Sequence, residues 1–114
     1  MKSKKYFPGR GDAVWLNFSP KAGHEQSGRR SAVVVSPKSY NKKVGLGLFC
    51  PITSQIKGYP FEVIIPAGLS ISGVVLSDQM ESLDWRVRNA QFICKLSEST
   101  ISEVLKKLST LMKE

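Results

Sequence analysis

The chain has 114 residues, 41% of them hydrophobic and 23% charged, and it carries a formal net charge of +8. This composition is ordinary for a globular protein and excludes an intrinsically disordered one. The length fits one domain over residues 1–114 with one modest core, and no apolar run approaches the roughly 20 residues that span a bilayer.

The N-terminal segment and the two cysteines indicate the compartment in which we expect the protein. The basic segment 1–5 is not followed by an apolar signal core, so we expect no secretory peptide and a cytoplasmic protein. Cys50 and Cys94 show no metal or redox spacing. They are expected to be two buried structural thiols in a reducing compartment.

The predicted strands, taken in chain order, make a small, mostly antiparallel β-barrel that a C-terminal helix closes. The first strand is expected at 13–18, where β-favouring residues follow a Gly-Asp turn. Residues 19–29 have no hydrophobic period and predict a long loop, whereas 31–36 form the apolar run typical of a buried central strand. A short helical turn can follow at 37–43. Further strands are expected at 46–52, 61–65, 73–77 and 91–95, with a loop at 53–60.

The last segment changes period and predicts an amphipathic helix over 98–112. Its apolar residues recur at helical spacing, from Ile101 to Met112, and are expected to pack on the sheet. Ser97 or Ser99 can cap its start, and Thr100-x-x-Glu103 fits a capping box one step later.

Positive charge is concentrated in the first half of the chain. Residues 1–61 contain eleven Lys and Arg against two acidic residues, whereas residues 62–114 contain six against seven. This asymmetry favours a polyanionic partner, either nucleic acid or an acidic protein. The alternative is a basic surface that merely keeps the protein soluble.

Two polar clusters lie beside predicted strands. Glu25-Gln26-Ser27-Gly28-Arg29-Arg30 runs into the 31–36 strand, and Thr53-Ser54-Gln55 follows the 46–52 strand. Together they offer a carboxylate, guanidinium groups and hydroxyls, which suit binding a phosphodiester and stabilising charge on it.

RNA can be cleaved without a metal because its own 2′-OH can attack the neighbouring phosphorus. Arg30 can hold the phosphate oxygens with two hydrogen bonds, and Thr53 and Ser54 can donate to the same oxygens. Glu25 is the one carboxylate between Asp12 and Glu62, and it can accept a proton or orient the 2′-OH.

Each of these residues also has a structural interpretation. Arg30 could form a salt bridge with Glu25, and Thr53 could cap a loop. His24, the single histidine, is the weaker catalytic candidate. Asp78, Glu81 and Asp84 match no metal motif and are expected to form a solvated turn. The sequence therefore predicts no cofactor, and a nuclease built from these residues would be independent of metal.

The pattern resembles the MazF branch of the MazF/PemK toxins over nearly the whole chain. The matching pieces are Gly11-Asp12-x-x-Trp15, Glu25-Gln26-x-Gly28-x-Arg30, Ala32-Val33-Val34 before Ser36-Pro37, Thr53-x-Gln55, Lys57-Gly58-Tyr59-Pro60-Phe61-Glu62-Val63, and Asp78-Gln79 before Trp85-Arg86. Ser31 replaces a common proline, and Leu76 stands where the PemK branch has arginine.

The resemblance implies an SH3-like homodimer that cuts single-stranded mRNA without ribosomes and leaves a 2′,3′-cyclic phosphate and a 5′-OH. Arg30 and Thr53 then carry the central catalytic roles, and Glu25 assists. It also implies a MazE-like antitoxin whose acidic tail lies across the active groove. The positions at which the family contacts RNA are Asn17, Phe18, Ser54, Lys57 and Gln79.

Two other functions remain open at this stage. CcdB toxins share the architecture but poison DNA gyrase, so the fold alone does not separate the two activities. A basic RNA-binding barrel without catalytic activity is the second alternative.

Overall fold

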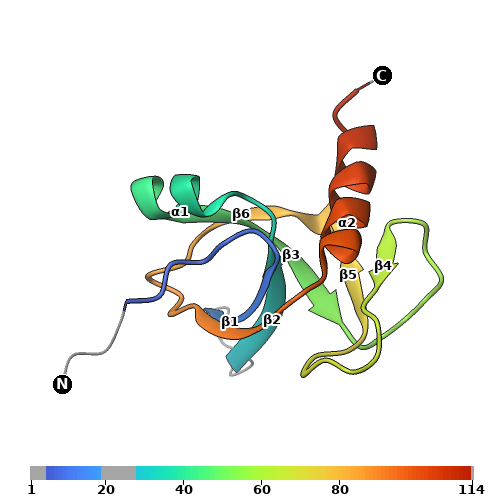
Figure 1. The fold of residues 1–114 in the computed structure, drawn as a ribbon, viewed down its shortest axis with the longest axis horizontal. Helices are drawn as coiled ribbons and strands as arrows, with labels where there is room; N and C mark the ends of the chain where they lie inside the picture. Colours follow the sequence, from blue (N-terminus) through green and yellow to red (C-terminus); the bar gives the residue numbers. More distant parts are fainter. Residues whose placement is uncertain (1–4, 19–27, 114) are drawn as a thin grey trace, which may run out of the picture.

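The computed structural model describes residues 5–18 and 28–113. These residues form a mainly antiparallel sheet with a C-terminal helix (Figure 1). The elements are β1 (Asp12–Phe18), β2 (Gly28–Val34), α1 (Lys38–Val44), β3 (Leu46–Thr53), β4 (Glu62–Ile64), β5 (Val74–Leu76), the 3-10 helix η1 (Ser77–Gln79), β6 (Glu81–Asp84), β7 (Gln91–Lys95) and α2 (Glu98–Thr110).

The strands follow the order β4-β5-β3-β2-β1-β7, and β6 pairs with β3 as well. All the recorded pairings among the described residues are antiparallel. The predicted fold class, a small antiparallel β structure with a C-terminal helix, is confirmed. The hydrogen bonds recorded for the described strands do not close this sheet into a complete barrel.

The central strands bury two apolar clusters on opposite faces, because successive side chains of a strand point to opposite sides. One cluster contains Ala13 and Val33 and is covered by Val104 of α2. The other contains Val14 and extends to Trp85. Because both faces of β1 and β2 pack against other residues, these strands form a firm support for whatever lies at their ends.

The α2 helix packs as its apolar period predicts, with Ile101, Val104 and Leu108 buried. Ser97 is the N-cap, and its hydroxyl oxygen accepts a hydrogen bond of 3.2 Å from the Thr100 backbone N–H. The alternative capping box that begins at Thr100 is wrong, because Thr100 lies inside the helix and is buried. The helix ends at Thr110, two residues earlier than predicted.

Predicted boundaries elsewhere shift by a few residues. The strand expected at 31–36 is β2 at Gly28–Val34, so residues 28 and 29 of the predicted loop are strand. The remainder of that loop, residues 19–27 with His24 and Glu25, lies outside the described residues. The helical turn expected at 37–43 is α1, which begins after Pro37.

The solvated turn predicted around Asp78, Glu81 and Asp84 is wrong. Asp78 lies in η1, and the other two are the ends of β6, which pairs with β3 through Glu81 opposite Phe49 and Asp84 opposite Leu46. The sequence of β6 lacks strong β-forming residues, so only its pairing with β3 makes it a strand. Among the described residues, no group of His, Cys, Asp and Glu is arranged to hold a metal ion.

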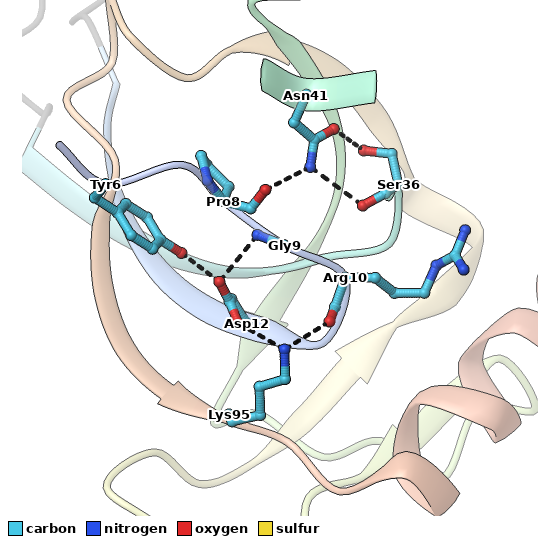
Figure 2. Close-up of polar contacts among 8 residues, drawn as sticks. All are labelled: Tyr6, Pro8, Gly9, Arg10, Asp12, Ser36, Asn41 and Lys95. Carbon is cyan, nitrogen blue, oxygen red and sulfur yellow. Dashed lines mark hydrogen bonds and ion pairs between the residues drawn. The ribbon is translucent and has the colours of Figure 1, made fainter. Parts of the chain in front are cut away.

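A buried carboxylate holds the N-terminal segment against β1 and β7 (Figure 2). One oxygen of Asp12 accepts hydrogen bonds from the Tyr6 hydroxyl at 2.6 Å and the Gly9 N–H at 2.9 Å. The other oxygen lies 3.1 Å from the ammonium nitrogen of Lys95. The Gly-Asp turn is therefore a structural anchor.

Two further expectations concern thiols and membrane spans. Cys50 is buried and Cys94 is half-buried, and both thiols are free. Burial, with a smaller contribution from Asp78, raises the pKa of the Cys50 thiol to about 12. No helix in the described part of the chain has the length and apolar character needed to cross a bilayer.

Candidate active site and nucleic-acid groove

An open groove of about 1090 Å³ lies where β1 ends, β2 begins and β3 ends. Side chains of these strands and of residues 70–83 line it. In Figure 1 these strand ends lie together at the bottom of the molecule, away from α1. The predicted site residues that line the groove are Phe18, Arg30, Thr53, Ser54 and Gln79.

Arg30 enters the groove from β2 with an exposed side chain. Strands β2 and β3 pair with Ala32 opposite Pro51. Arg30 and Thr53 each lie two residues beyond this pair, and both line the groove although they are distant in sequence. No described residue forms a hydrogen bond or ion pair with the Arg30 side chain. Within the described residues, its recorded contact is with the Phe18 ring.

Two arginine side chains, Arg30 and Arg88, lie over the Phe18 ring. The guanidinium carbon of Arg30 lies 5.6 Å from the ring centroid, and that of Arg88 lies 4.9 Å from it. Both distances are within the range of cation–π attraction. Arg88 also donates a 3.2 Å hydrogen bond to the Asn17 carbonyl. The ring thus brings a second positive charge to the edge of the groove.

The hydroxyl of Thr53 is oriented by its own loop. Its oxygen accepts a 3.1 Å hydrogen bond from the Gln55 N–H. Because this bond uses an acceptor position of the oxygen, the hydroxyl proton remains able to donate to a bound phosphate. The predicted loop-capping role and a phosphate-binding role are therefore compatible.

A smaller hollow of about 360 Å³ adjoins the groove and shares Thr53, Leu76 and Gln79 with it. Lys57 lines this hollow rather than the main groove. The carboxylate of Glu62 shapes the loop that carries Lys57, since it accepts 3.0 Å hydrogen bonds from the N–H groups of residues 57 and 58.

Tyr59 also lines the hollow, and its hydroxyl donates to the Asp78 carboxylate. This hydrogen bond is the largest cause of a raised pKa of the Tyr59 hydroxyl. The phenol therefore stays protonated at neutral pH. The Tyr59 and Phe61 rings lie 6.1 Å apart between centroids, so the two aromatic side chains contact each other beside the hollow.

Asn17 does not line the groove. Its amide oxygen accepts a hydrogen bond from Arg29, which also donates to the Asn89 carbonyl and the Gln91 amide oxygen, both at 3.0 Å. Both arginines line the groove, but Arg29 joins β1, β2 and the start of β7, whereas Arg30 has no such recorded partner among the described residues. Glu25, the proposed assisting carboxylate, lies outside the described residues.

Sequence reasoning missed Arg88 and Gly73. Arg88 follows the matched Trp85-Arg86 pair by two residues, and its spacing in the chain gives no sign that it reaches Phe18. Gly73 precedes β5, and a Cβ placed on it would meet the backbone of Thr53. A glycine before an apolar strand is a weak signal of such a close approach.

A comparison of the sequence with models of known protein families shows the family of the chain. The model of the PemK-like, MazF-like toxins of type II toxin-antitoxin systems matches residues 9–112. The chain belongs to this family. The prediction of a MazF-like toxin endoribonuclease is therefore confirmed at the level of the family.

Individual relatives agree with this MazF-like assignment. The endoribonuclease toxin MazF of Escherichia coli K12 is 50% identical over 86 residues, which are 75% of this chain and 77% of that protein. The endoribonuclease PemK of Escherichia coli is 32% identical over 107 residues, 90% of this chain and 80% of the relative. The fold matches MazF in a MazE–MazF crystal structure from Deinococcus radiodurans with a TM-score of 0.91 and 53% identity, over 95% of this chain and 97% of the other.

Proposed function

We propose that this MazF-like toxin acts as one domain and cleaves single-stranded RNA, chiefly mRNA, at a short sequence without ribosomes or metal. The observation that carries the proposal is that Arg30 and Thr53, from different strands, line one groove. A guanidinium and a hydroxyl are donors that suit a phosphate whose negative charge increases in the transition state.

The proposed reaction is a transesterification within the RNA. The 2′-oxygen forms a bond to phosphorus while the bond from phosphorus to the 5′-oxygen breaks. The 2′-OH loses its proton to a base, and the leaving 5′-oxygen gains a proton. The products are a 2′,3′-cyclic phosphate and a 5′-OH. Because the nucleophile belongs to the substrate, no metal-activated water is required.

Arg30 would hold the non-bridging oxygens with its planar pair of donors. The Thr53 hydroxyl would donate to the same phosphate, because its oxygen already accepts from the Gln55 N–H. Glu25 is proposed as the assisting carboxylate, which orients the 2′-OH or accepts its proton.

The flanking nucleotides would lie along the groove and the adjoining hollow. Phe18 offers an aromatic face, Ser54 a hydroxyl and Gln79 an amide at the groove, and Lys57 offers a charge at the hollow. Such groups recognise unstacked bases and phosphates of single-stranded RNA. Asn17 would contact RNA only at the outer edge, because its amide oxygen is held by Arg29.

The proposed partners are a second copy of the chain, in a homodimer, and a MazE-like antitoxin with an acidic C-terminal tail. The MazE–MazF complex of the Deinococcus relative motivates the antitoxin. The excess positive charge of residues 1–61 would attract both RNA and an acidic tail, so the two would compete.

The test is to incubate the full chain with a long single-stranded RNA in excess EDTA and to map new 5′ ends. We expect discrete cuts at one short sequence, cyclic phosphate ends, and no cuts in a DNA copy. Arg30→Ala should abolish cleavage while the fold and the dimer persist. Arg10→Ala is the matched control, because this exposed arginine lies at the other end of β2, where it donates to the Val35 carbonyl.

Cleavage that survives Arg30→Ala would refute the assignment of Arg30. Intact RNA from folded wild-type protein would refute the nuclease. In that case, inhibition of DNA supercoiling would indicate a gyrase poison, and salt-dependent binding of intact RNA would indicate a binding module.

A further inference from the structure

A second basic surface lies on α1, apart from the groove. It consists of the exposed side chains of Lys38, Lys42 and Lys43, with Arg86 beside the end of the helix. Arg86 donates a 3.4 Å hydrogen bond to the Lys42 carbonyl. We call these four residues the α1 basic surface.

The α1 basic surface is held in place by buried contacts. Asn41 is fully buried on the inner side of α1, and its amide donates to the carbonyls of Pro8 at 2.8 Å and Ser36 at 3.2 Å (Figure 2). The Asn41 carbonyl accepts a 3.0 Å hydrogen bond from the indole of Trp85. The lysines therefore project from a helix whose position is fixed.

The charges of this surface are not neutralised by the described residues. The recorded ion pair of the described chain is Lys95 with Asp12. Asp84 is the nearby carboxylate, and one of its oxygens already accepts 3.0 Å hydrogen bonds from the N–H groups of Arg86 and Val87. Lys42 and Arg86 each lie 4.9 Å from an aromatic ring centroid, of Phe7 and Trp85 respectively, and these contacts leave their charge in place. The α1 basic surface thus carries four positive charges that have no recorded ion pair among the described residues.

An aromatic side chain accompanies these cations. Tyr40, which falls between Lys38 and Lys42 in the sequence of α1 and nearest to Lys43 around the helix, has 40% of its surface exposed. Exposed aromatic rings interleaved with basic side chains are typical of single-stranded nucleic-acid surfaces, where bases stack and phosphates pair with cations.

The α1 basic surface and the groove lie at opposite ends of β3. This strand begins at Leu46, directly after α1, and ends at Thr53 in the groove. At about 3.3 Å per residue, Leu46 lies roughly 23 Å from Thr53 along the strand. Phe49, midway along β3, also lines the groove. Figure 1 shows α1 at the upper left and the groove strands' ends at the bottom. An RNA bound at Thr53 must therefore extend along the length of β3 to reach α1.

We propose that the α1 basic surface binds the backbone of an RNA chain that extends beyond the groove. This inference rests on the proposed function, because it extends the path of the same substrate. The surface would raise affinity for long RNA and leave the chemical step unchanged. It would act through phosphate contacts, so its contribution would depend on salt and not on sequence.

The test uses Lys38→Gln/Lys43→Gln, since neither side chain makes a recorded hydrogen bond or ion pair within the described residues. The control is Lys106→Gln/Lys113→Gln, which removes the same charge from exposed positions at the other end of the molecule. Binding is measured by fluorescence anisotropy over a salt series. The probes are 2′-O-methyl RNAs of about 6 and about 30 nucleotides, which lack the nucleophile and stay intact.

For the first variant we expect roughly tenfold weaker binding of the long RNA, and a log–log salt slope smaller by about 1.4. Binding of the short RNA should be unchanged, and the control variant should bind both as the wild type does. Equal effects of the two variants, or equal weakening for both RNAs, would overturn the inference. A variant that loses binding of a poly-glutamate peptide but binds both RNAs normally would also overturn the inference, and it would indicate an acidic protein partner.

Cleavage of ordinary RNA is measured separately on the same proteins. If the wild type leaves RNA uncut but the α1 variant loses long-RNA binding, the proposed function fails and the α1 inference stands. If the wild type cleaves RNA and the α1 variant binds long RNA as the wild type does, the proposed function stands and the α1 inference fails. On cleavage, the variant should raise KM for long RNA and leave kcat unchanged.

Discussion

Gly73 lies against the backbone of Thr53, so closely that a Cβ on the glycine would come within 2.2 Å of the Thr53 carbonyl oxygen. Gly73 also has φ near +114°, which side chains rarely adopt. This contact lets β5 pair with the last residue of β3, where Val74 is opposite Thr53. A residue without a side chain therefore determines where the candidate catalytic hydroxyl lies.

Gly73→Ala should reduce both stability and RNA cleavage, because the methyl group must push the Thr53 backbone away. Overpacking of this kind typically costs about 1–3 kcal/mol. The control is Gly68→Ala, since Gly68 has φ near +104° but no atom near its Cβ position. Urea unfolding and cleavage rates compare the two. A cleavage loss equal for both variants would mean that backbone strain, and not the Thr53 contact, is responsible.

Replacing the Thr53 hydroxyl should affect the chemical step. Thr53→Val removes the donor and keeps the shape, so kcat should fall by about 10²–10³, the usual effect of losing one transition-state donor. Thr53→Ser retains the hydroxyl and should keep most of the activity. Single-turnover cleavage with saturating protein measures the step directly. If valine and serine variants cleave equally fast, Thr53 only caps the loop.

The Asp12 anchor should contribute to stability and not to catalysis. Asp12→Asn weakens the acceptor for Tyr6 and Gly9 and removes the ion pair with Lys95, whose side chain is largely exposed. We expect a loss of about 2–3 kcal/mol in the free energy of unfolding, mostly from the buried hydrogen bonds.

Tyr6→Phe removes one donor to Asp12 and should cost about 1 kcal/mol. At a temperature where each variant remains folded, the cleavage rate per folded molecule should equal that of the wild type. A selective loss of activity in a fully folded Asp12→Asn protein would show that the anchor also acts on the groove.

Alkaline pH should destabilise the fold through Cys50. Burial, followed by the charge of Asp78, raises the pKa of this thiol from 9.0 to about 12. Below pH 9 both folded and unfolded states hold the proton. Between these values only the unfolded state loses it, so stability falls as pH rises from about 9 toward 12.

The loss from this one thiol can reach about 1.4 kcal/mol per pH unit. The pKa values of Tyr6 and Tyr59 are also raised, so ionisation of these phenols acts in the same direction. Urea midpoints between pH 8 and pH 10.5 measure the slope. Cys50→Ala should flatten it relative to Cys94→Ala, the half-buried control. An unchanged slope in Cys50→Ala would contradict the assignment.

Local patterns in the sequence were enough to predict most of the elements. The apolar run before Ser36 reflects burial on both faces of β2, and the helical spacing from Ile101 to Leu108 reflects burial on one face of α2. The family resemblance likewise rests on residue order. The predicted assisting role of Glu25 stays a prediction, because Glu25 lies outside the described residues.

Contacts between distant segments were decided only by the tertiary structure. Strand β6 has no β-forming pattern and exists because it pairs with β3. Arg88 reaches Phe18 and Gly73 reaches Thr53 through packing that no spacing in the chain encodes.

The sequence by itself thus determined the fold class, the basic half and the types of residue available for RNA chemistry. Which of them lie together depended on the pairing of β2 with β1 and β3, which puts Arg30 and Thr53 on one groove and lets Arg29 donate hydrogen bonds to Asn17 and to residues 89 and 91. The physical reason is that strand pairing joins residues distant in the chain, and side chains alternate across a strand, so one step of register moves every side chain to the other face.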